Sequence, residues 1–193
     1  MRKDFYIFRH GETDYNQAQR WQGQGVDIDL NANGRQQAEV LAQKLADCGL
    51  QVIYSSPLKR AKQTAQYVAA GHNLEIRILP ELTEGSVGDC EGMSKSEVAK
   101  KYPQVWDIWY GDNDIMDVRW PNGESKGEVQ QRMNRAFAEM LLAKEKVIGV
   151  ASHGAAIRYF LLQFGYGPHK MENTALFHLV WEDEKWILDG VNL

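Results

Sequence analysis

Short apolar runs alternate with amphipathic stretches along the chain, and this alternation predicts strands and helices in turn. A run that is apolar throughout is typical of a strand buried on both faces of a sheet, and such runs lie at 5–8 and 52–54. The segment 146–151 is apolar after Lys146 and predicts another buried strand. The segment 74–79 instead alternates apolar and charged residues, which predicts a more exposed strand. A longer amphipathic stretch separates each predicted strand from the next.

These stretches carry apolar residues three and four positions apart, which is the spacing of one helix face. The spacing predicts helices over 38–45, 57–68, 125–141 and 155–164. Ser56 and Pro57 have the residue types of an N-cap and a first helical turn, so we expect the second of these helices to begin there.

Capping boxes, in which a serine precedes a glutamate by three positions, predict helix starts at 94–97 and 125–128. The last apolar stretches, 175–181 and 186–190, flank a short charged turn and predict a hairpin. Strands that alternate with helices indicate an α/β fold, which we expect to be a three-layer αβα sandwich with a mostly parallel central sheet of about six strands. No repeat, low-complexity tract or linker interrupts the pattern, so residues 1–193 are expected to form a single domain.

Composition and charge narrow the classes of partner. The 193 residues include 22 Lys and Arg against 26 Asp and Glu, a formal net charge of −4, and the charges are interspersed. This balance argues against a nucleic-acid or membrane surface but is compatible with a small basic pocket. Cys48 and Cys90 match no zinc spacing and are expected to be reduced thiols. Because the apolar run at 5–8 is too short for a signal-peptide core, we expect a cytoplasmic protein.

Charged residues follow the predicted strands at the edge where an open α/β sheet binds its ligands. Arg9 and His10 follow the first strand, Arg60 lies after the second, Glu84 after the third and His153 after the fourth. Guanidinium groups are planar, permanently charged forks that match phosphate oxygens. Two of them at one edge therefore predict a locally positive pocket for a phosphate group.

Each of these residues also has a purely structural interpretation. A single histidine after a strand is most often a hydrogen-bonded structural residue, and Gly11 and Gly154 fit as ordinary turn residues. The pattern of an apolar strand followed by His-Gly nevertheless occurs twice, as FRHG and ASHG. This repetition favours a shared function over two separate structural roles.

A metal site is the other alternative at this edge. Its candidate ligands are His10, His153, Glu12 and Asp14. The two arginines would repel a divalent cation at the same point. We therefore expect an anion site, with no metal and no other cofactor.

Four motifs together resemble the histidine phosphatase superfamily, also called the phosphoglycerate mutase-like family. They are RHGET at 9–13, SSPLKRAKQTA at 55–65, LTEGSVGDCEG at 82–92 and SHG at 152–154. The resemblance covers nearly the whole chain and is to the branch in which RHGET is followed by an asparagine, here Asn16. One departure is Cys90, where the family frequently has a tryptophan, and it bears on local packing only.

The resemblance implies a phosphoglycerate mutase-like fold and a metal-independent phosphatase that acts on a small-molecule phosphomonoester. By motif position, His10 is the nucleophile that forms a phosphohistidine. Glu84 protonates the leaving oxygen and then takes a proton from the attacking water. The groups implied around the phosphate are Arg9, Arg60, His153, Asn16, Gln22 and Gly154.

Two other functions stay open: a phosphoglycerate mutase-type transfer between hydroxyls, and a phosphate-binding protein without turnover. A cap-like insertion is expected at about 93–124, and its shortness relative to mutases of the family favours a phosphatase. Its cations Lys100, Lys101 and Arg119 keep the mutase alternative open. Its aromatic residues either pack against the sheet edge or contact the substrate: Trp106, Trp109, Tyr110 and Trp120.

Overall fold

The computed structural model describes residues 1–111, 115–167 and 171–193. Within them the chain forms a six-stranded sheet in the order β3-β2-β4-β1-β5-β6. The parallel strands are β1 (Lys3–Arg9), β2 (Val52–Ser55), β3 (Ile76–Ile78) and β4 (Val147–Ser152). Strands β5 (Leu176–Glu182) and β6 (Lys185–Val191) are antiparallel to their neighbours and form the predicted hairpin. The expected mostly parallel α/β sheet is confirmed.

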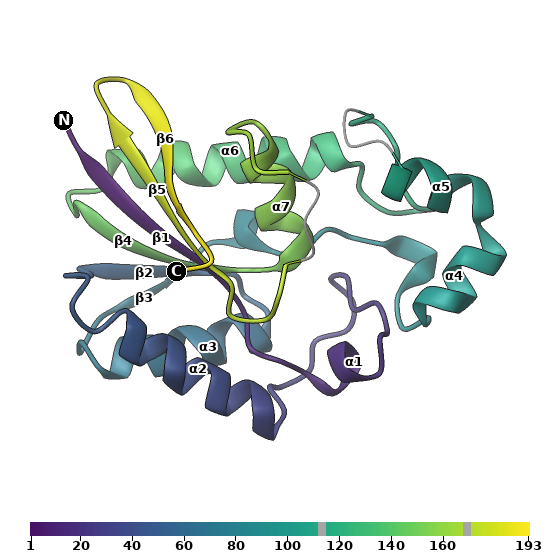
Figure 1. Ribbon diagram of the computed structural model, residues 1–193, viewed down its shortest axis with the longest axis horizontal. Helices are drawn as coiled ribbons and strands as arrows, with labels where there is room; N and C mark the ends of the chain where they lie inside the picture. Colours follow the sequence, from purple (N-terminus) through teal and green to yellow (C-terminus); the bar gives the residue numbers. More distant parts are fainter. Residues whose placement is uncertain (112–114, 168–170) are drawn as a thin grey trace.

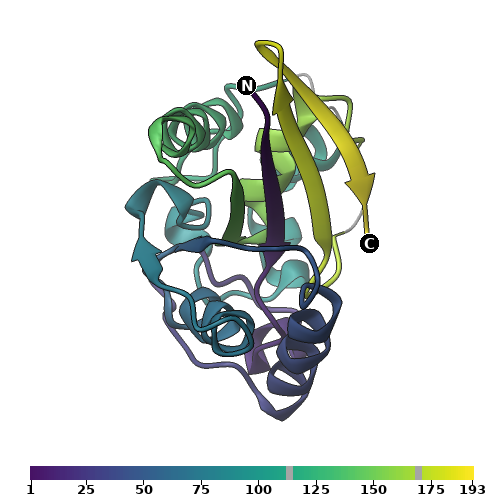
Figure 2. The ribbon, with the colours of Figure 1, turned by 90° about the vertical axis from the view of Figure 1, so that its left-hand side faces the viewer.

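Helices cover both faces of this sheet (Figure 1 and Figure 2). One face carries α2 (Ala32–Lys44) and α3 (Lys59–Ala70), and the other carries α6 (Lys126–Leu142) and α7 (Gly154–Leu162). Alternate strand residues therefore enter two separate cores. Phe8 packs with the α2 and α3 side chains, while Ile7 packs with those of α6 and α7.

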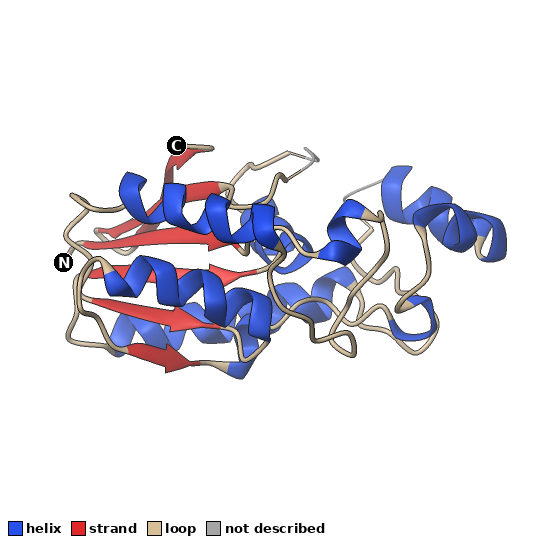
Figure 3. Cartoon of the chain, turned by 90° about the horizontal axis from the view of Figure 1, so that it is seen from below, coloured by secondary structure: helices blue, strands red, loops and turns tan. Residues whose placement is uncertain are grey.

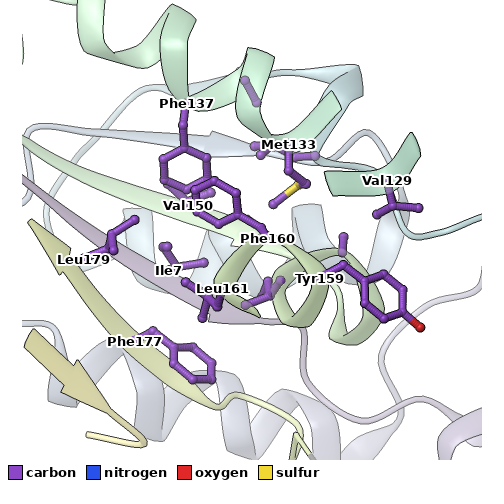
Figure 4. Packing of buried hydrophobic residues seen from close by; sticks show 14 of the residues in the cluster. Ile7, Val129, Met133, Phe137, Val150, Tyr159, Phe160, Leu161, Phe177 and Leu179 are labelled. Atoms are coloured by element: carbon purple, nitrogen blue, oxygen red, sulfur yellow. The ribbon is translucent and has the colours of Figure 1, made fainter. Parts of the chain in front are cut away.

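The core on the α6 and α7 side is rich in aromatic residues (Figure 4). The rings of Phe137 and Phe160 stack with their centroids 4.0 Å apart. Tyr159 belongs to the same core, but its hydroxyl points away from the other labelled side chains. Cys90 is also fully buried in this core.

Two helices begin at other residues than the pattern predicts. Helix α2 begins at Ala32, six residues early, because its first turns are polar and Asn31 caps them with its side chain. Helix α3 begins at Lys59 after Leu58, so the prediction that Ser56 is its N-cap and Pro57 its first turn is wrong. The Ser56 hydroxyl instead lies 2.7 Å from a ring nitrogen of His153.

Both capping boxes are confirmed, at the starts of α4 (Lys95–Lys101) and α6. The exposed strand predicted at 74–79 is the short edge strand β3. The last predicted helix, α7, ends at Leu162, before Gly165 with its φ of +83°. No helix in the described part of the chain is both long and apolar enough to cross a membrane.

The remaining short elements lie beyond the carboxyl ends of the parallel strands (Figure 3). They are α1 (Asp14–Gln17), η1 (Pro80–Leu82), η2 (Gly88–Cys90), α4 and α5 (Pro103–Gly111). The segment 93–124 contributes α4 and α5 to this end, and its residues 112–114 lie outside the described residues. The functional residues predicted at the strand ends thus face a layer of loops and short helices.

Candidate active site

The central strands end at the same level, which brings their following residues together. Arg9 at the end of β1 is in register with Ser152 at the end of β4. The backbone N–H of His10 continues this pairing and donates to the Ser152 carbonyl over 3.1 Å. The rings of His10 and His153 consequently lie with their centroids 5.2 Å apart.

A cavity of about 520 Å³ opens at this edge of the sheet. It is lined by seven of the eight residues predicted for the site, namely Arg9, His10, Asn16, Gln22, Arg60, Glu84 and Gly154. The eighth, His153, is completely buried and lies outside the cavity lining. Seven of the predicted residues thus share one cavity, and the buried ring of His153 lies next to that of His10.

His10 is held as a neutral imidazole with one defined tautomer. Its Nδ1 lies 2.7 Å from the carbonyl oxygen of Gly11, and because a carbonyl only accepts, Nδ1 carries the proton. Burial lowers the pKa of His10 well below its ordinary 6.5, and the charges of Arg60 and Arg9 lower it further. The other ring nitrogen, Nε2, is left with its lone pair.

Arg60 is fully buried and joins three parts of the site. Its Nη1 and Nη2 donate to the carbonyls of Val26 and Gly23, each over 2.8 Å, and its Nε donates to Nδ1 of His153 over 3.2 Å. Burial lowers the pKa of Arg60 to about 10, which still leaves it charged at neutral pH. Arg60 therefore gives the site a permanent positive charge.

Arg9 provides a second cation with an unused donor. Its Nη1 donates to the Met171 carbonyl, but its buried Nε has no hydrogen-bond partner among the described residues. Gly154 makes room for this group, since a Cβ there would lie 3.3 Å from Nε of Arg9. An orphaned guanidinium N–H beside a cavity is suited to an anionic oxygen.

His153 has both ring nitrogens engaged within the protein. Because Arg60 only donates, Nδ1 of His153 is an acceptor, and Nε2 therefore carries the proton that it shares with the Ser56 hydroxyl. Burial lowers the pKa of His153 well below 6.5, with Arg60 as the next cause. The ring is thus a neutral link between Arg60 and Ser56.

The Glu84 carboxylate lies at the first turn of α7. Its Oε1 accepts from the backbone N–H groups of Gly85 and Ala156 over 2.9 and 3.0 Å, and its Oε2 accepts from that of Ala155 over 3.3 Å. A helix N-terminus favours a negative charge, because its N–H groups are free and its dipole is positive there. These three hydrogen bonds hold the Glu84 carboxylate at the start of α7, in the lining of the cavity.

Two amide side chains complete the polar lining. The oxygen of Asn16 accepts from the backbone and hydroxyl of Thr13, and the oxygen of Gln22 accepts from the same hydroxyl. No acceptor contacts either amide nitrogen within the described residues. Both nitrogens are thus available as neutral donors.

The four aromatic residues of the inserted segment separate into two groups. Trp109 and Tyr110 line the cavity, whereas Trp106 and Trp120 do not. Trp120 is fully buried and packs edge-on against Trp21, with centroids 4.7 Å apart. Trp120 and Trp109 pack against Trp21 and against Tyr159 of α7, and not against the sheet edge. Contact of Trp109 and Tyr110 with a substrate stays a prediction.

The three cations that kept the mutase alternative open lie outside the cavity lining. Lys100 and Lys101 are exposed on α4, and Arg119 pairs with Glu128 over 3.1 Å. None of the three lines the cavity. Arg158, which follows no strand and belongs to none of the four motifs, does line it. The Nη2 of Arg158 donates to the Tyr159 hydroxyl over 2.9 Å, and its buried Nε has no partner in the described ranges.

Two further supporting residues escaped the sequence analysis. Ser56 was assigned to a helix cap, which concealed its contact with His153. Thr64 accepts from the backbone N–H of Gly11 over 3.0 Å and donates to the Arg60 carbonyl over 2.8 Å. The four-residue spacing of Arg60 and Thr64 on one helix was the available signal for the second contact.

The candidate metal ligands are arranged differently from a metal site. The Glu12 carboxylate accepts from the side-chain amide of Asn31 over 2.9 Å. Across residues 1–111, 115–167 and 171–193, no group of three or more His, Cys, Asp and Glu side chains is placed to hold a metal ion.

Comparisons with known proteins agree with this geometry. The chain is 33% identical to an uncharacterized phosphatase of Bacillus subtilis, over 97% of this chain and 93% of that protein. It is 36% identical to a probable phosphoglycerate mutase of Serratia proteamaculans, over 96% and 88% of the two chains. The fold matches a mycobacterial glucosyl-3-phosphoglycerate phosphatase solved with VO3, with a TM-score of 0.90, 27% identity and 98% coverage of both chains.

Relatives and structural neighbours are thus named phosphatases, with mutases among the relatives. The family model that matches the sequence covers residues 5–193. With the paired His-Gly strand ends and the arginines beside them, this match shows that the chain belongs to the histidine phosphatase superfamily, branch 1.

Proposed function

We propose that this protein is a metal-independent phosphomonoester hydrolase that works through a covalent phosphohistidine on His10. The observation that carries the proposal is the tautomer of His10. Its Nδ1–H is bound to Gly11, so the lone pair of Nε2 is the free nucleophile, in a cavity that also contains Arg9 and Arg60.

In the first step, Nε2 of His10 attacks the phosphorus and the bond from phosphorus to the ester oxygen breaks. The leaving oxygen takes a proton from Glu84, so that a neutral alcohol departs; Glu84 enters this step as the carboxylic acid that the second step regenerates. In the second step, a water molecule attacks the phosphorus and the N–P bond breaks. Glu84, now a carboxylate, takes a proton from that water, and inorganic phosphate leaves.

The phosphoryl oxygens gain charge in both transition states, and fixed donors stabilise that charge without reorganisation. We assign this role to Arg9 through its orphaned Nε, to Arg60, and to the amide nitrogens of Asn16 and Gln22. Gly154 allows Arg9 to approach α7. His153 would contribute its Nε2–H after releasing Ser56.

We assign residues 93–124 to a cap within a single domain of residues 1–193. The assignment is supported by Trp109 and Tyr110, which line the cavity and whose aromatic rings are suited to cover the leaving group and exclude water. A small-molecule phosphomonoester fits a cavity of about 520 Å³.

The second candidate is a phosphoryl transfer between two hydroxyls of one substrate. One observation favours it: Arg158 lines the cavity, and its buried Nε has no hydrogen-bond partner among the described residues. A mutase needs such a cation to hold a second acidic group. A hydrolase for substrates with a second acidic group would use it equally well, so the fate of the phosphoryl group separates the two.

The test is hydrolysis of p-nitrophenyl phosphate with excess EDTA, followed by rapid acid-free quenching and detection of phosphorylated histidine by mass spectrometry. We expect turnover that EDTA leaves unchanged, and a phosphate group on the peptide containing His10. The His10→Ala variant is expected to lose both signals. A loss of activity with EDTA that a divalent ion restores would refute metal independence.

Two other outcomes would replace the proposal. Binding of vanadate without hydrolysis of any phosphomonoester would indicate a phosphate-binding protein. Transfer of phosphate between hydroxyls of one substrate, with little free phosphate, would indicate a mutase. A screen of phosphorylated metabolites that measures released phosphate distinguishes these cases and identifies the substrate.

A further inference from the structure

We propose that Arg132, Glu124 and Gln24 form a clamp that positions Glu84 for proton transfer by holding the main chain on both sides of it. The inference rests on the role given to Glu84 in the proposed function, and it assigns a task to three residues outside the phosphate-binding groups. The three come from α6, from the loop before it and from the loop after α1.

Arg132 uses all five of its N–H donors. Two form a fork on the Glu124 carboxylate, from Nε over 2.8 Å and from Nη2 over 3.0 Å. The other three reach three carbonyls of the loop that carries the proton donor: Glu81 at 2.8 Å, Thr83 at 2.6 Å and Glu84 itself at 2.9 Å. One buried guanidinium thus fixes the chain from η1 to Glu84.

Glu124 and Gln24 complete the clamp from the other side. Oε2 of Glu124 accepts from the backbone N–H of Ser86 over 2.9 Å, two residues beyond Glu84. The side-chain amide of Gln24 donates to the same carboxylate oxygen over 2.9 Å and to the Glu84 carbonyl over 2.8 Å. The main chain is therefore held before, at and after Glu84.

Gln24 also connects the clamp with the phosphate end of the cavity. Gly23 and Val26 lie in the same loop as Gln24, and their carbonyls accept hydrogen bonds from Arg60. The backbone N–H of Gln24 donates to Glu91 over 3.0 Å. The same short segment therefore contacts both Arg60 and Glu84, and its hydrogen bonds fix the distance between these two residues.

A proton donor needs this arrangement because its side chain must leave one set of contacts for another. The Glu84 carboxylate now accepts three backbone N–H groups near α7, and it must turn toward the leaving oxygen to act. With the main chain held, only the side-chain torsions have to change. Without the clamp, the loop would shift as well, and the distance to the leaving oxygen would vary.

Stability alone is a weak explanation for the clamp. Burying an ion pair removes two charges from water, and this cost often cancels the attraction between them. The side chains of Arg132 and Glu124 are only 9% and 24% exposed. The nearby pair of Arg119 and Glu128 is about half exposed and neither residue lines the cavity, which makes Arg119 the control position.

The experiment measures kcat/KM for a series of substituted phenyl phosphates, because kcat/KM reports the first step alone. Leaving groups of low pKa need no proton, whereas those of high pKa depend on Glu84. In Arg132→Lys we expect about a 10- to 100-fold fall for the poorest leaving group and less than about a 3-fold fall for dinitrophenyl phosphate. The plot of log kcat/KM against leaving-group pKa therefore becomes steeper.

Two reference variants, measured beside the wild type, make the result decisive. Glu84→Gln lacks the proton donor and is expected to give the steepest plot of log kcat/KM against leaving-group pKa. Arg119→Lys is expected to keep the wild-type slope. An unchanged slope in folded Arg132→Lys would overturn the clamp, provided Glu84→Gln steepens it. An unchanged slope in Glu84→Gln would instead refute the proton-donor role in the proposed function.

Gln24→Leu covers the case in which Arg132→Lys does not fold. Gln24 is partly exposed and its loss removes two of the hydrogen bonds without leaving a buried charge. We expect a smaller steepening in the same direction. A Gln24→Leu protein with the circular dichroism spectrum and slope of the wild type would overturn the inference on its own.

Discussion

Arg60 fixes the tautomer of His153 through one hydrogen bond, from its Nε to Nδ1 over 3.2 Å. Since a guanidinium can only donate, the proton of His153 must be on Nε2, where Ser56 now accepts it. The same guanidinium holds the Gly23 and Val26 carbonyls. Arg60 is therefore both a source of positive charge and the residue that sets the geometry around it.

Replacing Arg60 with lysine tests whether charge or geometry matters more. An ammonium at the end of a flexible chain cannot contact two carbonyls, the His153 ring and a phosphoryl oxygen from the positions of a planar fork. We expect Arg60→Lys to lower kcat/KM for p-nitrophenyl phosphate by about 100-fold, in line with the loss of a fixed transition-state donor.

Arg135→Lys is the matched control for this change, because Arg135 is exposed on α6 and outside the cavity. It is expected to keep wild-type kinetics. Wild-type kinetics in Arg60→Lys would remove Arg60 from the site.

Ser56→Ala tests whether His153 moves to the phosphoryl group. The substitution leaves the buried Nε2–H without its acceptor, which should lower the free energy of unfolding by about 1–3 kcal/mol. In the wild type, His153 must give up its hydrogen bond to Ser56 before it can donate to a bound anion. In Ser56→Ala there is no such bond to give up. We then expect vanadate to bind about 5-fold more tightly, corresponding to about 1 kcal/mol.

Calorimetric titration with vanadate measures this affinity. Ser152→Ala is the control, since the Ser152 hydroxyl is equally buried and donates to the Leu82 carbonyl over 2.7 Å. It should lose stability without any gain in affinity. Equal vanadate affinity in wild type and Ser56→Ala would show that His153 stays with Ser56 throughout.

The two buried histidines make stability depend on pH in a defined direction. The pKa values of His10 and His153 are well below 6.5 in the folded protein, but near 6.5 once unfolding exposes them. Below about pH 6.5, the unfolded chain therefore binds protons that the folded chain does not, and the free energy of unfolding falls as the pH falls. The slope approaches about 1.4 kcal/mol per pH unit for each histidine and vanishes above about pH 7.5.

Urea unfolding between pH 5.5 and 7.5 measures this slope. In His10→Gln and in His153→Gln it should decrease by up to about half, because one of the two groups no longer titrates. A slope that is the same in wild type and both variants would contradict the assignment.

The strand ends could be predicted from the sequence because they depend on local pattern. A buried strand is visible as an apolar run, and the residue that follows it must lie at the sheet edge, as His10 does. The family motifs then located Glu84, although β3 ends six residues before it. These features need no knowledge of distant contacts.

The missed features depend on contacts between residues far apart in sequence. Ser56 and Pro57 have the types of a helix start, but the hydroxyl is used by His153, 97 residues away. The apolar spacing of α6 does not indicate the contacts of Arg132. The carbonyls that it binds, at Thr83 and Glu84, lie about 50 residues earlier in the sequence. Hydrogen-bond partners of this kind follow from the fold and not from spacing.

The cavity wall formed by α5 provides the last prediction, on leaving-group selectivity. Tyr110 lines the cavity, yet 45% of it is exposed, so it can be truncated without opening the core. If its ring covers the leaving group, Tyr110→Ala should lower kcat/KM about 10-fold for naphthyl phosphate, which corresponds to about 1.4 kcal/mol of lost apolar contact. Ethyl phosphate, which is too small to reach the ring, should be affected less than about 2-fold by the same reasoning.

Ile108→Ala is the control on the same helix, because Ile108 is 41% exposed and lies outside the cavity lining. It should leave both substrates unaffected. An equal fall for naphthyl and ethyl phosphate in Tyr110→Ala would mean that the ring acts on the shared phosphate end or on stability. No change with either substrate would mean that the α5 wall leaves the bound alcohol uncovered, and the assignment of residues 93–124 as a cap would lose its support.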